Sequence, residues 1–257
     1  MNFIDTHTHL FASEFDNDID IVIENAIDSG ISKMLLPNID SATTTKMLQL
    51  CDRYPKNCYP MIGLHPCSVK KDNIEKEILH VEQMLNQNNF IAIGEIGLDL
   101  YWDKSTLDLQ KIAFESQIKL AKEHNLPAVI HVRDSFHEAI EIVERLNDDN
   151  LSGVFHCFTG NIEEAKRIIN LENFYLGIGG VVTFKNGGIN NIINQISLDN
   201  IILETDSPYL TPTPFRGKRN ESKFLVNIAQ KMSEIYEIDI NEIANKTSSN
   251  AKNLFKI

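Results

Sequence analysis

The chain has 257 residues, of which 36 are Asp or Glu and 24 are Lys or Arg, so its formal net charge at pH 7 is −12. This acidic balance argues against a general nucleic-acid coat protein, and a content of 42% hydrophobic residues excludes a disordered or fibrous chain. No window approaches the roughly 20 apolar residues that a membrane span requires, and the N-terminus turns polar before a signal peptide could form, so we expect a cytoplasmic protein without membrane contact.

Short β-rich segments alternate with longer amphipathic segments, which is typical of parallel βα units. The eight predicted strands are Phe3–Asp5, Lys33–Leu36, Tyr59–Gly63, Ile91–Glu95, Ala128–His131, Gly153–His156, Tyr175–Ile178 and Ile201–Glu204. Eight repeats in a chain of this length predict an α/β fold, a closed (β/α)₈ TIM-type barrel forming one domain over residues 1–257. A doubly wound open sheet is the rival, but His-Thr-His replaces its usual Gly-rich turn after the first strand.

Helical periodicity is clearest over Leu107–His124, where the expected apolar stripe includes Ile112 and Phe114. Three prolines within residues 207–219 exclude a regular helix there and predict a stiff, basic loop. Extra helices are then expected at Ser222–Tyr236 and Asn241–Phe255, with Asp239 as N-cap of the second.

Ionisable side chains follow several predicted strands at the same relative position. His7 and His9 follow the first strand, and because a strand points residues i and i+2 to one face, both imidazoles should turn inward. The other members of this set, each after an apolar strand, are Glu95, His131, His156 and Asp206. A barrel brings the carboxyl ends of its strands together around one mouth, so we expect these six side chains to converge.

Six ligand-type side chains in one register favour a metal site over six unrelated hydrogen-bonded strand caps. Imidazole suits Zn²⁺-like metals, whereas carboxylate and water accommodate Mg²⁺ or Mn²⁺. The sequence therefore predicts one or two divalent ions, and the residue types do not choose among Mg²⁺, Mn²⁺ and Zn²⁺.

Seven sequence blocks together resemble the TatD-type metal-dependent deoxyribonucleases, a branch of the amidohydrolase-like barrels, over nearly the whole chain. The blocks are Phe3–Leu10 (FIDTHTHL), Gly63–Pro66 (GLHP), Ile93–Asp99 (IGEIGLD) with Tyr101–Lys104 (YWDK), Pro127–Asp134 (PAVIHVRD), Phe155–Gly160 (FHCFTG), Gly177–Phe184 (GIGGVVTF) and Leu203–Leu210 (LETDSPYL). Each block alone is a weak signal, whereas the set is specific. The resemblance implies a (β/α)₈ barrel, two divalent metal ions and hydrolysis of DNA phosphodiester bonds through a metal-activated water, as a 3′-to-5′ exonuclease.

The resemblance also implies roles by position. The implied metal ligands are His7, His9 and Asp206 for the first ion, Glu95 as the bridge, and His131 and His156 for the second. Asp206 is also expected to take the proton of the attacking water, so Asp206, Glu95 and His65 are the catalytic candidates. His65 matches the substrate-side histidine of the family and could donate a hydrogen bond to the scissile phosphate or leaving group. The alternative is that its ring only supports the loop before Pro66.

Further residues are candidates for substrate binding alongside His65. Arg133 is expected to contact phosphate or support the metal centre, although an ordinary salt bridge with Asp134 is an alternative. Trp102, the only tryptophan, could stack on a base or instead pack under a lid. Arg216 belongs to a basic set that could form a positive rim around a polyanion, or could simply be solvated; the other members are Lys185, Lys218 and Arg219.

Other histidines and the cysteines receive no chemical role. The histidines within helical segments are expected to be solvated: His80, His124 and His137. The four cysteines lack paired C-x-x-C spacing, which favours reduced, buried thiols: Cys51, Cys58, Cys67 and Cys157. Two positions depart from the family pattern, since Cys67 replaces a frequent second His and Ser222 replaces a Pro.

Three functions follow from these residues. The first is a nuclease acting on DNA, with RNA as the alternative nucleic-acid substrate. The second keeps the site and changes the substrate, as an amidohydrolase or deacylase acting, for example, on aminoacyl-tRNA; a carbamylated Lys would favour it, but Glu95 and His131 occupy the relevant strand ends. The third is a silent nucleic-acid-binding barrel, disfavoured because converged acids without a metal are costly to bury. A monomer is the default expectation, because no apolar helix face is left uncommitted.

Overall fold

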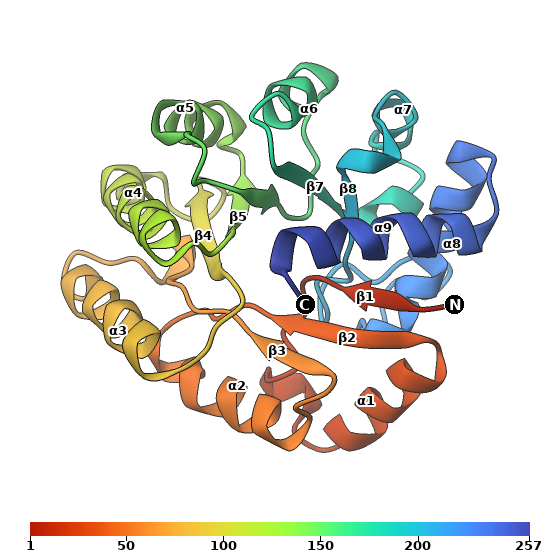
Figure 1. Cartoon of the computed structure of the whole chain (residues 1–257), viewed down its shortest axis with the longest axis horizontal. Coiled ribbons are helices and arrows are strands. Elements are labelled where there is room, and N and C mark those ends of the chain that lie inside the picture. The colour runs from red at the N-terminus through yellow and green to blue at the C-terminus, as the bar shows by residue number, and fades with distance from the viewer.

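The computed structural model describes all 257 residues, with an inner ring of strands and an outer ring of helices (Figure 1). The strands are β1 (Phe3–Asp5), β2 (Ile31–Leu36), β3 (Cys58–Pro60), β4 (Ile93–Asp99), β5 (Ala128–Arg133), β6 (Gly153–Phe155), β7 (Phe174–Ile178) and β8 (Ile201–Leu203). The helices are α1 (Ile19–Asp28), α2 (Ser41–Arg53), α3 (Ile74–Gln87), α4 (Leu107–His124), α5 (Phe136–Leu146), α6 (Ile162–Ile169), α7 (Asn190–Ile193), α8 (Leu225–Tyr236) and α9 (Ile240–Phe255). None of these helices has the length and apolar character needed to cross a bilayer.

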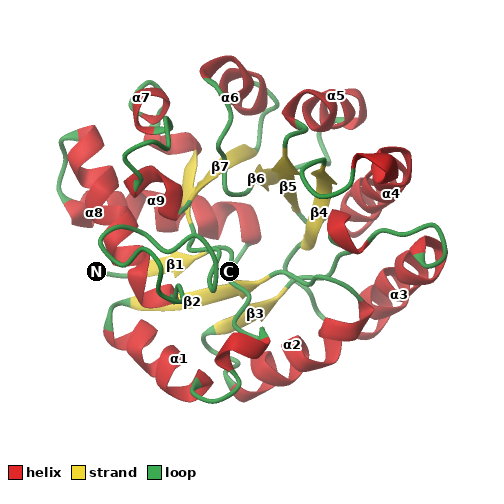
Figure 2. Ribbon diagram, turned by 180° about the vertical axis from the view of Figure 1, so that it is seen from behind, coloured by secondary structure: helices red, strands yellow, loops and turns green.

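All strand pairs are parallel and follow chain order, as β1-β2-β3 and β4-β5-β6-β7-β8. A parallel bridge between Ile62 and Ile93 joins β3 to β4. At the other seam, the amide of Thr6 donates to the carbonyl of Leu203 at 3.1 Å. The two groups of strands therefore meet at both edges, and the view from behind in Figure 2 shows the same ring enclosed by helices. The expected (β/α)₈ barrel with additional C-terminal helices is confirmed.

The strand ends differ from the expected ones in a way that affects the site. β4 runs to Asp99 rather than ending at Glu95, because it stays paired with β5 as far as Arg133. A register shift between Ile93 and Ile96 interrupts this pairing, which is the geometry of a β-bulge. Glu95 thus lies inside a strand at an irregular point, not at a strand end.

The helices match the sequence expectations closely. α4 has the predicted bounds, and Asp239 caps α9 by accepting from the amide of Asn241. α8 begins at Leu225, because residues 222–224 form a short 3₁₀ turn. The placement of Ile112 on the apolar stripe was wrong, since this side chain is 57% exposed and faces away from the barrel.

None of the four cysteines has a disulfide partner. Cys51 and Cys58 are buried as expected. The expectation was wrong for Cys67, which is exposed, because it lies in the loop at the barrel mouth just after Pro66. Cys157 is partly buried.

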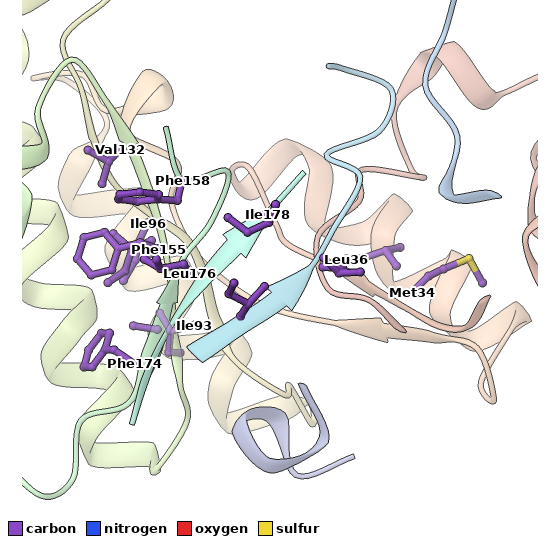
Figure 3. Packing of buried hydrophobic residues seen from close by; sticks show 14 of the residues in the cluster. Met34, Leu36, Ile93, Ile96, Val132, Phe155, Phe158, Phe174, Leu176 and Ile178 are labelled. Carbon is purple, nitrogen blue, oxygen red and sulfur yellow. The ribbon is translucent and has the colours of Figure 1, made fainter. Parts of the chain in front are cut away.

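The larger part of the hydrophobic core fills the space between the strand ring and the helices. Figure 3 shows Phe155, Leu176 and Ile178 of neighbouring strands packed in this layer with Phe158. Each fully buried side chain of this size contributes about 1.5–3 kcal/mol through removal from water. This layer holds the helices against the ring.

A second, smaller core fills one end of the barrel itself. Its members are one residue from or beside each of seven strands, together with three residues of α9: Ile4, Leu35, Met61, Ala92, Val129, Val154, Ile202, Ala251, Leu254 and Phe255. α9 crosses the ring in Figure 1 and closes this end, which we call the closed end. Two residues further along the chain, the interior positions are His131 in β5, His156 just after β6 and Glu204 just after β8, because alternate residues of extended chain share a face. The side chains that point into the barrel thus change from apolar to ionisable over a distance of two residues along the chain.

Candidate metal centre and active site

Glu95 lies at the middle of the ionisable end of the barrel, which we call the open end. Its Oε2 atom is 3.2 Å from Nε2 of His7 and 3.4 Å from Nε2 of His9. Its Oε1 atom is 2.7 Å from Nδ1 of His131 and 2.9 Å from Nε2 of His156. One carboxylate therefore faces two separate pairs of imidazoles, one pair with each oxygen.

Asp206 completes the first of these groups. Its Oδ1 atom is 3.5 Å from Nε2 of His9 and 3.8 Å from Nε2 of His7. The backbone holds it there, since the amide of Asp206 donates to the carbonyl of His7 across the β8–β1 seam. The ring of His7 stacks on that of His156 with centroids 3.8 Å apart, so the two groups are in direct contact. The structure thus brings all six expected ligands together.

The electrostatics of this cluster combine acids that stay ionised with imidazoles of two kinds. The pKa values of His9, His131 and His156 are raised, whereas those of His7 and His65 are lowered by burial. Burial opposes ionisation of Glu95, but the imidazoles of His65, His156 and His7 outweigh it and hold the pKa of Glu95 well below its usual range. Burial likewise disfavours a charged His156, but Glu95 and Glu204 raise the pKa of His156 well above its usual range. The cluster therefore attracts positive charge to its centre.

A divalent cation fits this donor set. The facing ring nitrogens of His7 and His9 are 3.3 Å apart, as are those of His131 and His156. Nitrogens at that distance repel through their lone pairs unless a proton or cation lies between them. Mixed imidazole and carboxylate donors suit Zn²⁺-like ions and Mn²⁺. The sequence-based ligand set is therefore chemically consistent with the geometry.

His65 belongs to the same cluster but differs from the six in its hydrogen bonding. Its Nδ1 atom accepts from the amide of Cys67 at 3.1 Å, and its Nε2 atom lies 3.3 Å from Oε1 of Glu95. Burial lowers the pKa of His65 and favours the neutral ring. A neutral ring that accepts at Nδ1 carries its proton on Nε2. His65 therefore presents a donor to the centre, as expected of a residue that hydrogen-bonds substrate.

Two acids that contact the histidines of the centre from outside were missed by the sequence reasoning. Asp99 accepts from Nε2 of His131 at 3.0 Å, and Glu204 lies 3.4 Å from Nδ1 of His156. Outer carboxylates of this kind fix the tautomer and orientation of a metal-binding imidazole. The only available signal was the alternation of inward-facing residues, which places Glu204 two residues before Asp206.

Two glycines let the backbone come close to this centre. A Cβ atom on Gly97, whose φ is +139°, would lie 2.0 Å from the carbonyl oxygen of His131. A Cβ atom on Gly177 would lie 2.4 Å from Oε2 of Glu204. Gly97 therefore requires glycine, and a side chain at position 177 would displace the carboxylate of Glu204.

The centre opens into a cavity of about 670 Å³ at the open end of the barrel. Trp102 and Arg133, both expected to bind substrate, line this cavity. The guanidinium carbon of Arg133 is 3.6 Å from the ring centroid of Tyr101 and 5.6 Å from that of Trp102. Trp102 is 72% exposed, so the expected alternative of packing under a lid was wrong. Tyr209, which the sequence reasoning did not select, lines the cavity near His9.

The expected basic rim is largely engaged elsewhere. Arg219 pairs with Asp18 and Glu221, which ties the loop after β8 to the start of α1. Arg216 donates to the carbonyl of Thr211, and its guanidinium lies 3.9 Å from the ring centroid of Phe184. Neither residue lines the cavity, where Arg133 is the one Lys or Arg side chain. The path of the loops decides these pairings, and sequence alone does not give that path.

Comparison with known proteins gives consistent findings. A family model described as "TatD related DNase" matches residues 4–256. The uncharacterized metal-dependent hydrolase YabD of Bacillus subtilis is 40% identical over 254 residues, covering 98% of each chain. The crystal structure of YjjV, a TatD homolog from Escherichia coli K12, superposes with a TM-score of 0.89 at 27% identity, covering 99% of this chain and 98% of that one. A TatD family hydrolase from Entamoeba histolytica gives a TM-score of 0.86 at 25% identity, with coverage of 99% and 98%.

Proposed function

The chain belongs to the TatD related DNase family and is a metal-dependent hydrolase, and from that premise we propose that it is a deoxyribonuclease that removes nucleotides from the 3′ end of DNA. The observation that carries the proposal is Glu95, with one oxygen toward His7 and His9 and the other toward His131 and His156. Two divalent ions bridged by one carboxylate would match this arrangement.

The two ions would be held by the six converged side chains. His7, His9 and Asp206 would bind the first ion, His131 and His156 the second, and Glu95 would bridge. Divalent ions in such a centre polarise a phosphoryl oxygen and lower the pKa of water. Side chains of the protein would carry out the proton transfers.

Two side chains would handle protons during phosphodiester hydrolysis. Asp206, ionised because His9 and the neighbouring imidazoles lower its pKa against the effect of burial, would accept the proton of the attacking water. His65, with its proton on Nε2, would donate a hydrogen bond to the scissile phosphate or the leaving oxygen. Asp206 and His65 both line the cavity, where a scissile phosphate would bind.

The cavity supports action on a chain end. About 670 Å³ falls within the usual size of a pocket that buries one small ligand, which suits a terminal nucleotide. Arg133 would contact the phosphate, and Trp102 would stack on a base, a contact of about 1–3 kcal/mol. Arg216 would contribute only at longer range, since its guanidinium already contacts Thr211 and Phe184.

The test uses purified protein stripped with EDTA and supplied with Mg²⁺, Mn²⁺ or Zn²⁺. Single-stranded DNA labelled at the 3′ or 5′ end, matched RNA and an aminoacyl ester are compared, with Asp206→Asn as the matched control. We expect metal-dependent shortening of DNA from the 3′ end that the variant lacks. Ester hydrolysis without DNA cleavage would keep the metal centre and assign the function to the deacylase alternative.

A further inference from the structure

Asp99 makes contacts in two directions from the end of β4. Its Oδ2 atom accepts from Nε2 of His131 at 3.0 Å. Its Oδ1 atom accepts from the backbone amides of Tyr101 at 2.9 Å and Trp102 at 3.4 Å. Asp99 is 2% exposed, although its partners Trp102 and His131 are not buried. One carboxylate thus joins a histidine of the metal centre to the segment that carries the exposed aromatic pair.

The backbone of Asp99 is fixed independently of these contacts. Its amide donates to Oε1 of Gln110 at 2.8 Å, and Nε2 of Gln110 donates back to its carbonyl at 3.0 Å. Gln110 lies on α4 and is buried. The backbone of Asp99 is therefore held in place by α4. A change in the hydrogen bond between Asp99 and His131 should alter the Tyr101–Trp102 segment rather than the position of β4.

The Tyr101–Trp102 segment has few other restraints. Tyr101 is 53% exposed and Trp102 is 72% exposed. Their rings contact one another and the guanidinium of Arg133, which follows His131 by two residues on β5. No hydrogen bond from either amide goes elsewhere than to Asp99, which makes this carboxylate the main polar anchor of the segment.

We propose that Asp99 is a positioning residue that couples metal binding at His131 to the conformation of the Tyr101–Trp102 segment. An imidazole that binds a cation through Nδ1 becomes a stronger donor at Nε2, which tightens its bond to the outer carboxylate. A tighter bond at Oδ2 restricts rotation of the carboxylate and so keeps Oδ1 aligned with the two amides, which orders the exposed Tyr101–Trp102 pair when the centre is loaded. The inference depends on the metal centre of the proposed function but not on the identity of the substrate.

The sequence provides a direct probe, because Trp102 is the only tryptophan in the chain. The experiment titrates EDTA-stripped, full-length protein with Zn²⁺ or Mg²⁺, which are diamagnetic, and follows Trp102 fluorescence anisotropy and acrylamide quenching. Calorimetry on the same samples measures metal affinity. We expect wild-type Trp102 to become less mobile and less accessible to acrylamide as metal binds.

The informative variant is Asp99→Asn, whose amide oxygen can still accept from Tyr101 and Trp102 but whose NH₂ group cannot accept from His131. We expect its metal affinity to fall about 10–100-fold, as for other outer partners of metal-binding histidines. At metal concentrations that saturate the variant, the Trp102 response should be lost. The matched control is Asp103→Asn, because Asp103 caps Ser105 in the same loop without touching His131.

Several outcomes would overturn the coupling. If metal-saturated Asp99→Asn shows the full change in Trp102 anisotropy and quenching, the loop does not depend on Asp99 for its response to metal. If the wild-type protein binds metal without any change in Trp102, the loop does not respond to the metal centre at all. If Asp99→Asn does not fold, Tyr101→Pro deletes one loop-side amide, and reciprocity of linked binding requires its metal affinity to fall as well. Absence of metal binding by the wild type would instead refute the metal centre itself. A negative nuclease assay would refute the proposed substrate but not the coupling, because the titration measures metal binding and Trp102 without any substrate.

Discussion

The two ends of the barrel interior are built from the same strands but from opposite kinds of residue. At the closed end, Val129 and Val154 pack against Leu254 and Phe255 of α9 without any polar atom among their side chains. At the open end, the next inward residues are His131 of β5, which is partly buried, and His156 just after β6, which is buried; both contact ionised Glu95. The contrast shows that this barrel separates stability from chemistry along its axis, as barrels of this class generally do.

The difference has an energetic reason. Burying converged acids and imidazoles costs free energy unless charges are paired, so the open end gains little stability from its own packing. The closed end and the helix layer supply the apolar burial that offsets this cost. Substitutions at the two ends should therefore change different quantities.

The largest effect is expected at the open end from Asp206→Asn. Loss of a proton acceptor in the reaction should lower the turnover rate by about 10²–10⁴-fold, while the metal-free variant should unfold at nearly the same temperature as the metal-free wild type. The measurement is the rate of metal-dependent hydrolysis together with a melting curve. A near-native rate would remove Asp206 from the mechanism.

The closed end should behave in the opposite way. Phe255→Ala leaves a cavity in the core at the closed end of the barrel, and we expect the free energy of unfolding to fall by about 3–5 kcal/mol. Activity per folded molecule should be unchanged. Urea unfolding and active-site titration measure the two quantities, and a selective loss of turnover would show that the ends are coupled.

Metal removal tests whether the two ends of the barrel contribute additively to the free energy of unfolding. An ion present at about 100 times its dissociation constant should stabilise the fold by about 2.7 kcal/mol, which EDTA would remove. Because Phe255 lies at the other end of the barrel, the same loss is expected in Phe255→Ala. Glu95→Ala should show no loss, since it should not bind the metal. Calorimetric melting with and without EDTA compares the three proteins.

The smallest effect concerns the ion pair that joins two loops of the open end. Arg219 lowers the pKa of Asp18 in the folded protein through direct hydrogen bonds. The pair therefore stabilises the fold fully at pH values above the pKa that Asp has in the unfolded chain. This stabilisation is lost as the pH falls through the lower pKa of Asp18 in the folded protein. Both side chains are partly exposed, which limits the contribution to about 0.2–1 kcal/mol.

Asp18→Asn should therefore lower stability at pH 7, particularly at low salt, and should lower it less at pH 3, where the carboxyl of the unfolded chain is largely protonated. Urea titrations at the two pH values measure this difference. An equal loss at both values would mean that packing of Arg219 on Phe15, rather than its charge, holds the loops together.

The parts of the molecule that local sequence rules determine were predicted well. The period of α4 and the cap at Asp239 depend on nearby residues, and both are found in the structure. The convergence of His7 with Asp206 followed from parallel topology, which brings the carboxyl ends of the strands to one side. These features need no knowledge of loop paths.

Features that depend on distant partners could not be predicted in the same way. The β-bulge that places Glu95 inside β4 results from pairing with β5. The contact of Asp99 with His131 joins two strands, and the pairing of Arg219 with Asp18 joins residues about 200 positions apart. A single sequence records the charge of each residue but not the neighbour that neutralises it.

The position of α9 across the closed end also bears on how the protein is made. Ser248 of α9 donates to the carbonyl of Asn2, and Ala251, Leu254 and Phe255 cover Ile4. During translation the first strand leaves the ribosome long before the segment that covers it, so the nascent barrel exposes apolar side chains until Ile240–Phe255 has emerged. Exposed surface of this kind is recognised by chaperones and promotes aggregation. Stalling of synthesis shortly before Ile240 should therefore leave a chain dependent on chaperones, whereas emergence of Ile240–Phe255 permits α9 to cover the closed end.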